Sequence, residues 1–380
     1  MTKMLASVTG PEEAAVALAG GADIIDLKDP ARGALGAVDS RAVRDTVAAI
    51  AGRRAVSAVT GDTPMRPDAV LAAAETMAAT GADYIKQGLF PGGEPEACIR
   101  ALAPLSARTR LIAVLFADRG PDFSLLPLLA ESGFAGAMLD TAGKSEGRLL
   151  DHMELTALCR FVDACAAHRL LSGLAGSLEA PDIPRLLLLR PGVLGFRSAL
   201  CGAGGRTGPI DRESMQEIRA LIPPEAEANN GMGVDHRLLS AHGYVPDLTG
   251  DPALMDRVFV RDLVLPVHIG AYAHERRAPQ RVRFDVDAMI GRAPHPTHDM
   301  RDVFSYDVIS DGIRLLVDSG HVPLVETLAE RIAAMLLAHP RVLKVRVQVE
   351  KLDVGPHLVG VAIERTREQA TPYAGFGLEA

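Results

Sequence analysis

The chain of 380 residues is longer than one hydrophobic core usually supports, which favours two domains. Its 48% hydrophobic and 23% charged residues are typical of a folded soluble protein without a membrane-spanning segment. The net charge of -8 argues against a nucleic acid partner, because binding to a phosphate backbone needs an excess of basic residues. Four cysteines without a C-x-x-C pair, and a start that lacks the features of a secretion signal, predict a cytoplasmic protein.

Residues 1–222 alternate short apolar runs with amphipathic or alanine-rich segments, the pattern of βα units on a parallel sheet. The predicted strands are 4–8, 23–28, 55–59, 83–87, 111–116, 135–140, 170–176 and 193–197. Helices are expected between them, including 11–19, 41–51, 67–79 and 151–168. Eight such units favour a (βα)8 TIM barrel, an α/β fold, and an open doubly wound sheet is the alternative.

The pattern changes after residue 222. Residues 223–253 contain two adjacent prolines, an Asn-Asn-Gly run and net acidic charge, which indicates a linker. Residues 254–370 then show longer alternating segments and two amphipathic helices, followed by a tail at 371–380. We expect strands at 257–270, 281–290, 342–352 and 358–367, and helices at 307–320 and 324–340. This order predicts a smaller α+β domain with an antiparallel sheet.

Lysine is rare in this chain, with six lysines among 40 basic residues, yet three of them follow predicted strands of the barrel. Lys28 ends the second strand, Lys86 lies at the end of the fourth, and Lys144 comes just after the sixth. Strand ends of this kind meet at the barrel mouth, where active sites lie. A lysine amine can lose its proton and add to a carbonyl to form an imine, which a guanidinium cannot do. Asp26 and Asp140 lie beside two of these lysines, so simple ion pairing is the alternative.

A phosphate site is expected after the seventh and eighth strands of such a barrel. The segments 174–177 and 195–208 supply glycine N–H groups and an arginine at a strand end. The predicted substrate-binding residues are Gly176, Ser177, Arg197, Gly202, Gly204 and Gly205.

The segments GGADIIDLKDP, ADYIKQGL, MLDTAGK and LAGS, together with the glycine-rich loop, resemble (5-formylfuran-3-yl)methyl phosphate synthase of methanofuran biosynthesis over residues 4–221. The resemblance implies a lyase-type barrel that condenses two molecules of glyceraldehyde 3-phosphate, with loss of phosphate and water. It also implies that Lys28 is the imine-forming amine. The other catalytic groups would be Lys86, Lys144, Asp26 and Asp140.

The segments HIGAYAHERRAPQRVRFDV, DVFSYDVI, LVETLAERIA and VQVEKLDVG resemble dihydroneopterin aldolase over residues 257–367. The resemblance implies a tunnelling fold that assembles into rings, with active sites between subunits, and therefore a homo-oligomer. Its functional positions correspond to Glu275, Tyr306 and Lys351 as catalytic residues and a buried Glu326 as the residue that binds the pterin. Leu352 stands where the family commonly has proline, and the next loop is shorter, so an inactive assembly domain is the alternative.

These observations predict a bifunctional biosynthetic enzyme whose partners are small-molecule substrates, a triose phosphate and a dihydropterin. Two working sites would supply two one-carbon carriers, a furan cofactor and a pterin. The alternative is a Schiff-base aldolase of another sugar phosphate carried on an inactive oligomerisation domain. The HPTHD segment at 295–299 has an H-x-x-H spacing, but its proline-interrupted context lacks a third ligand. We therefore expect a protein without a metal or other cofactor.

Overall fold

The computed structural model describes residues 2–143, 146–202, 205–222, 255–272, 275–292, 300, 303–354 and 358–370. The chain divides into two compact units after Ile222. The predicted linker, the predicted tail and the HPTHD segment lie outside the described residues. None of the helices in the described part is long and apolar enough to cross a membrane.

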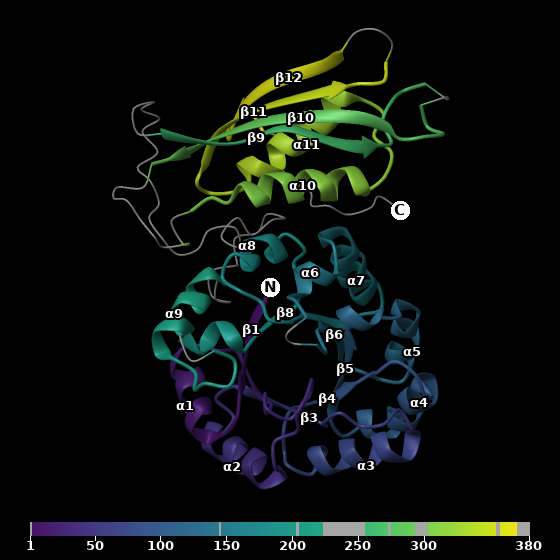
Figure 1. Ribbon diagram of the computed structural model, residues 1–380, viewed down its shortest axis with the longest axis vertical. Coiled ribbons are helices and arrows are strands. Elements are labelled where there is room, and N and C mark those ends of the chain that lie inside the picture. Colours follow the sequence, from purple (N-terminus) through teal and green to yellow (C-terminus); the bar gives the residue numbers. More distant parts are fainter. Residues whose placement is uncertain are drawn as a thin grey trace. The chain divides into compact units, whose positions relative to one another are not determined.

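The first unit is a closed barrel of parallel strands in the order β1 to β8, and the pairing of β1 with β8 closes it. The strands are β1 (Lys3–Val8), β2 (Ile24–Leu27), β3 (Ala55–Val59), β4 (Tyr84–Gly88), β5 (Arg110–Phe116), β6 (Gly136–Asp140), β7 (Leu171–Leu174) and β8 (Val193–Phe196). Helices surround these strands in an outer ring (Figure 1). The predicted (βα)8 barrel is therefore confirmed, and the open sheet is excluded.

The outer helices are α1 (Pro11–Ala19), α2 (Ser40–Ile50), α3 (Pro67–Ala78), α4 (Pro95–Ser106), α5 (Leu126–Glu131), α6 (Leu149–His152), α7 (Leu155–Ala167), α8 (Asp182–Leu187) and α9 (Arg212–Leu221). Proline opens α1, α3 and α4, a position where its missing N–H breaks no helical hydrogen bond. The single helix expected over 151–168 was wrong. Met153 and Glu154 have extended backbones, which end α6 and delay the start of α7.

Strand register explains how polar residues come to lie inside the barrel. Asp26 on β2 is level with Ser7 on β1 and with Ser57 on β3. Side chains level with one another on neighbouring parallel strands point to the same side, and successive side chains alternate between the two sides. Ile25 and Leu27 therefore face the helices, while Asp26 and the two serines face the barrel interior.

The second unit is an antiparallel sheet in the order β12-β11-β10-β9. Its strands are β9 (Met255–Val267), β10 (Gln280–Gly291), β11 (Val342–Lys351) and β12 (Val359–Thr366), and its helices are α10 (Tyr306–Asp318) and α11 (Val325–Leu337). The two helices lie on one face of the sheet (Figure 1). Every second residue of β10 from Val282 to Ala288 is fully buried, as expected for a strand with one apolar face. The predicted α+β domain is confirmed.

Candidate active sites

A buried group of hydrogen bonds surrounds Asp26 inside the barrel. Its Oδ2 atom accepts hydrogen bonds from Lys86 Nζ at 2.7 Å and Ser7 Oγ at 3.0 Å. Its Oδ1 atom accepts a hydrogen bond from Ser57 Oγ. Asp26 is fully buried and Lys86 is 4% exposed, so the pair has little contact with water. The opposite charge and the two hydroxyl donors, supplied by strands β1 to β4, compensate the lost hydration of this carboxylate.

A second buried ion pair spans the barrel mouth. Lys28 directly follows β2 and Asp140 ends β6, so the two residues come from opposite sides of the eight-stranded barrel. Lys28 Nζ lies 2.8 Å from Asp140 Oδ2, and the N–H of Thr141 donates to Asp140 Oδ1 at 2.8 Å. The two charged residues are 7% and 5% exposed. The amines of Lys28 and Lys86 thus each contact a carboxylate that can accept a proton.

The third predicted lysine, Lys144, lies outside the described residues, but the backbone just before it is held in place. The carboxylate of Asp118 accepts the N–H of Ala142 and of Gly143, each at 2.7 Å. Burial disfavours the charged form of Asp118, yet these N–H groups stabilise it enough that its pKa lies below the ordinary value. Sequence reasoning missed Asp118, although an acidic residue two positions after a predicted strand was a usable signal.

A pocket lies beside the Lys28–Asp140 pair, at the ends of β7 and β8. It is lined by Lys28, Pro30, Asp140, Ala175, Gly176, Ser177, Gly195, Arg197, Ser198 and Arg206. Gly176 has a φ of +120°, and a Cβ atom there would lie 3.0 Å from the Thr141 side chain, so this backbone path requires glycine. Of the predicted phosphate residues, Gly176, Ser177 and Arg197 line the pocket. Gly202 and Gly205 are exposed and do not line it, and Gly204 is outside the described residues.

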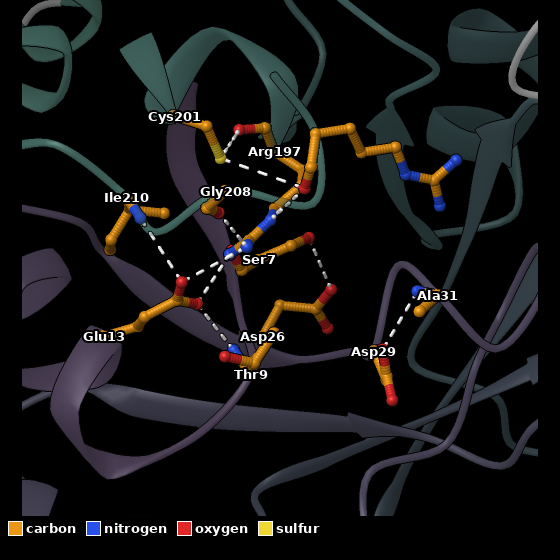
Figure 2. Close-up of polar contacts among 11 residues, drawn as sticks. Ser7, Thr9, Glu13, Asp26, Asp29, Ala31, Arg197, Cys201, Gly208 and Ile210 are labelled. Atoms are coloured by element: carbon orange, nitrogen blue, oxygen red, sulfur yellow. Dashed lines mark hydrogen bonds and ion pairs between the residues drawn. The ribbon is translucent and has the colours of Figure 1, made fainter. Parts of the chain in front are cut away.

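Arg197 is held by protein groups at all five of its N–H positions. It donates to Glu13 at 2.6 and 3.2 Å, as Figure 2 shows. Its other hydrogen bonds go to the carbonyl oxygens of Ser7 at 3.1 Å, Arg206 at 3.0 Å and Gly208 at 2.7 Å. A guanidinium has five N–H donors, so this arrangement leaves Arg197 none for a substrate. Glu13 and Arg197 instead tie α1 and β1 to β8 and the loop after it.

In the second unit, Glu275 and Lys351 form an ion pair that is largely buried. Lys351 Nζ lies 2.6 Å from Glu275 Oε1, which also accepts from Gln280 Nε2 at 3.1 Å. The N–H of Tyr272 donates to Glu275 Oε2 at 3.0 Å. The Lys351 ammonium and then the Tyr272 N–H lower the pKa of Glu275 to about 2, so this carboxylate is ionised at neutral pH.

The structure does not bring the other two predicted residues of this unit to that pair. Tyr306, at the start of α10, is 63% exposed. Glu326 lies in the first turn of α11 and is exposed. The expectation of a buried carboxylate was therefore wrong for the single chain. Within the described residues, neither side chain forms a hydrogen bond or an ion pair with Glu275 or Lys351. A second chain would have to cover these residues to bury them.

Comparison with known proteins assigns different relatives to the two units. Residues 4–219 match the family model of 4-HFC-P synthase. A Methanosarcina mazei protein named (5-formylfuran-3-yl)methyl phosphate synthase is 34% identical over 230 residues, which cover 57% of this chain and 98% of the relative. A Methylorubrum extorquens protein that carries the same name provisionally is 46% identical over 228 residues, covering 60% of this chain and 94% of the relative.

Residues 258–366 match the family model of dihydroneopterin aldolase. A crystal structure of dihydroneopterin aldolase from Burkholderia thailandensis, bound to guanine, is 34% identical to this chain. The similarity covers 30% of this chain and 96% of that protein, with a TM-score of 0.28.

Replacing Asp26 by asparagine should destabilise the barrel, because Lys86 would keep a buried charge without its carboxylate. We expect Asp26→Asn to lower the free energy of unfolding by about 3–5 kcal/mol. Lys86→Met alone should also destabilise the barrel, whereas the double variant Asp26→Asn/Lys86→Met has neither charge. The double variant should therefore lose less stability than the sum of the losses in the two single variants. Urea unfolding of the wild type, the two single variants and the double variant, followed by circular dichroism, measures this coupling. Additive losses would contradict it.

Glu13→Gln should remove a contribution to stability that depends on pH. Burial disfavours the charged carboxylate, but Arg197 and the Thr9 N–H favour it more, so the pKa of Glu13 is lowered on folding. Its contribution is therefore complete above the unfolded pKa of about 4.5 and disappears as pH falls through the lower folded pKa. We expect melting temperatures of the wild type and the variant to differ at pH 7 and to converge as pH falls through the lowered pKa of Glu13. Glu12→Gln, at an exposed neighbour, is the control, and a difference that does not change with pH would count against the ion pair.

Proposed function

The chain belongs to the 4-HFC-P synthase family, and we propose that its barrel condenses two molecules of glyceraldehyde 3-phosphate into (5-formylfuran-3-yl)methyl phosphate. The atoms balance when one phosphate and two waters leave. The observation that carries this proposal is the contact between the Lys28 amine and the Asp140 carboxylate at the barrel mouth. The two groups supply a nucleophile and a base, side by side and largely shielded from water.

The first step uses Lys28 as a nucleophile. Asp140 takes a proton from the ammonium group, and the free amine attacks the carbonyl carbon of one triose phosphate. Loss of water from the adduct gives an imine, whose protonated form withdraws electrons from the neighbouring carbon. A proton leaves that carbon, and the resulting enamine adds to the aldehyde carbon of the second triose phosphate.

The remaining steps need proton transfer and a place for anions. Asp26 lies two residues before Lys28 on β2, so the Asp26–Lys86 pair lies one side-chain layer below the reacting amine. This pair and Lys144 would exchange protons during dehydration and phosphate loss. Gly176 and Ser177 line the pocket beside Lys28 and would bind a substrate phosphate.

The second unit, by our proposal, cleaves a dihydroneopterin-type substrate by a retro-aldol reaction without an imine. The Glu275–Lys351 pair supplies proton-transfer groups, and the match to the dihydroneopterin aldolase family supports this chemistry. Tyr306 and Glu326 are exposed and would complete a site together with a second copy of the chain. The protein would then be a homo-oligomer held together by this unit, and it would make precursors of a furan and a pterin carrier.

Lys28→Arg should preserve the fold and reduce furan formation by roughly a thousandfold or more, because arginine keeps a positive charge but cannot form the imine. Ultraviolet absorbance of the furan aldehyde measures turnover with glyceraldehyde 3-phosphate. Borohydride reduction during turnover should add a triose phosphate to Lys28 of the wild type and to no residue of the variant. Lys3→Arg, at an exposed lysine of the same barrel, is the matched control. Unchanged turnover in Lys28→Arg would remove this residue from the role of nucleophile.

Separate variants should abolish the two activities of the full-length protein one at a time. We expect Lys351→Met to slow cleavage of 7,8-dihydroneopterin by about a hundredfold or more and to leave furan formation unchanged. Lys28→Arg should show the opposite behaviour. Lys344→Met changes a partly exposed lysine of the same strand β11, which pairs with Glu364 and not with Glu275, and serves as the control. A wild-type protein without measurable pterin cleavage would leave the second unit with an assembly role only.

A further inference from the structure

Arg206 differs from the other charged residues of the mouth pocket, because no residue in the described part of the chain forms an ion pair with its guanidinium. It lines the pocket together with Lys28 and Asp140. Among the residues that the structure describes, none accepts a hydrogen bond or forms an ion pair with this guanidinium. The backbone of the same residue is fixed, because its carbonyl oxygen accepts a hydrogen bond from Arg197 Nε at 3.0 Å. The protein thus holds the residue in place and leaves its donors available.

The charges around the pocket point to an anionic ligand. Lys28 is balanced by Asp140, and Arg197 is balanced by Glu13. Arg206 adds one positive charge that no described residue pairs with. Burial lowers the pKa of Arg206, whereas the Asp140 carboxylate raises it by a smaller amount. Both effects are expected for a guanidinium that is partly removed from water and lies near that carboxylate. Removing a cation from water without a partner is costly, so a site of this kind favours a bound anion.

The backbone near Arg206 can complete an anion site. Gly176 and Ser177 line the same pocket, and within the described residues their N–H groups donate no hydrogen bond. A phosphate bound there could accept hydrogen bonds from backbone N–H groups and from two guanidinium N–H donors, the forked contact for which arginine is suited. Lys28 lines this pocket too, so a three-carbon chain could extend from the phosphate to the amine.

We propose that Arg206 binds the phosphate of the triose that reacts with Lys28, and that Arg197 positions Arg206 without touching substrate. The inference rests on the proposed function for the identity of the ligand, a triose phosphate. By this proposal, the Arg206 side chain makes the enzyme select phosphorylated over unphosphorylated aldehydes. Sequence reasoning selected Arg197 for this task because it ends a strand, whereas Arg206 stands among glycines in the loop that follows.

Binding of an unreactive probe tests this assignment without relying on furan formation. Isothermal titration of the full-length protein with glycerol 3-phosphate should show an affinity at least about tenfold weaker for Arg206→Gln, as expected for the loss of a charged hydrogen-bonding group. Arg206→Lys keeps the charge without the fork and should bind with intermediate affinity. Arg44→Gln, at an exposed arginine of α2, should bind as the wild type does. Wild-type affinity in Arg206→Gln or in Arg206→Lys would overturn the proposal, as would a wild type that does not bind the probe.

Borohydride trapping on Lys28 provides a second readout and separates the two proposals. The wild type should be trapped at lower concentrations of glyceraldehyde 3-phosphate than of glyceraldehyde, and Arg206→Gln should lose this preference by about tenfold or more. Unchanged trapping of glyceraldehyde itself by the variant would show that Lys28 is intact. A wild type that traps triose phosphate but makes no furan would reject the proposed product and leave the role of Arg206 standing. A variant that keeps the wild-type preference would reject the role of Arg206, whatever the product.

Discussion

The charges buried inside the first unit are stable there only as pairs. Asp26, Lys86, Lys28 and Asp140 are each at most 7% exposed, and an isolated charge in such surroundings would cost several kcal/mol. Each charge must therefore meet its partner, which requires the correct register of β1 to β4 and the closure of the whole barrel. A shift of β2 by one residue would turn Asp26 toward the helices and expose both pairs to this cost.

Beside the β1–β8 pairing that closes the barrel lies an ion pair of a different kind. Glu13 and Arg197 join α1, β1 and β8, and every donor of the arginine is used within the protein. Arg206, nine residues later in the chain, has no such partners among the residues that the structure describes. The two arginines of this loop thus differ in their hydrogen bonds. Arg197 uses all its donors on carbonyl and carboxylate oxygens and fixes the backbone, whereas Arg206 keeps donors that, by our proposal, bind a ligand. The hydrogen bonds of an arginine therefore indicate its role better than its position at a strand end.

The sequence carried enough information for the strands of both units and for the residues at the barrel mouth. Apolar runs mark buried parallel strands because both faces are covered, and lysines that interrupt such runs at strand ends must face the interior. The pairing was harder to predict: Asp26 lies beside Lys28 in the sequence, yet it pairs with Lys86 on β4. Strand tilt and barrel closure decide such partners, and neither is encoded locally. Glu326 is exposed in the single chain, so its predicted burial would need a second chain, which one sequence does not describe.

The charged groups of the barrel are distributed unequally between strands β1 to β4 and strands β5 to β8. Strands β1 to β4 contain Asp26, Lys86 and the hydroxyl donors, and Lys28 follows β2, so the first half holds a complete internal ion pair and the amine that we propose to form the imine. Strands β5 to β8 and their loops provide Asp140 and the pocket that contains Arg206. Recombination between β4 and β5 would therefore keep the Lys28 amine in one parental half and exchange the loops that line the pocket in the other. If the proposed roles hold, such chimaeras would change the affinity for the substrate without changing the residue that forms the imine.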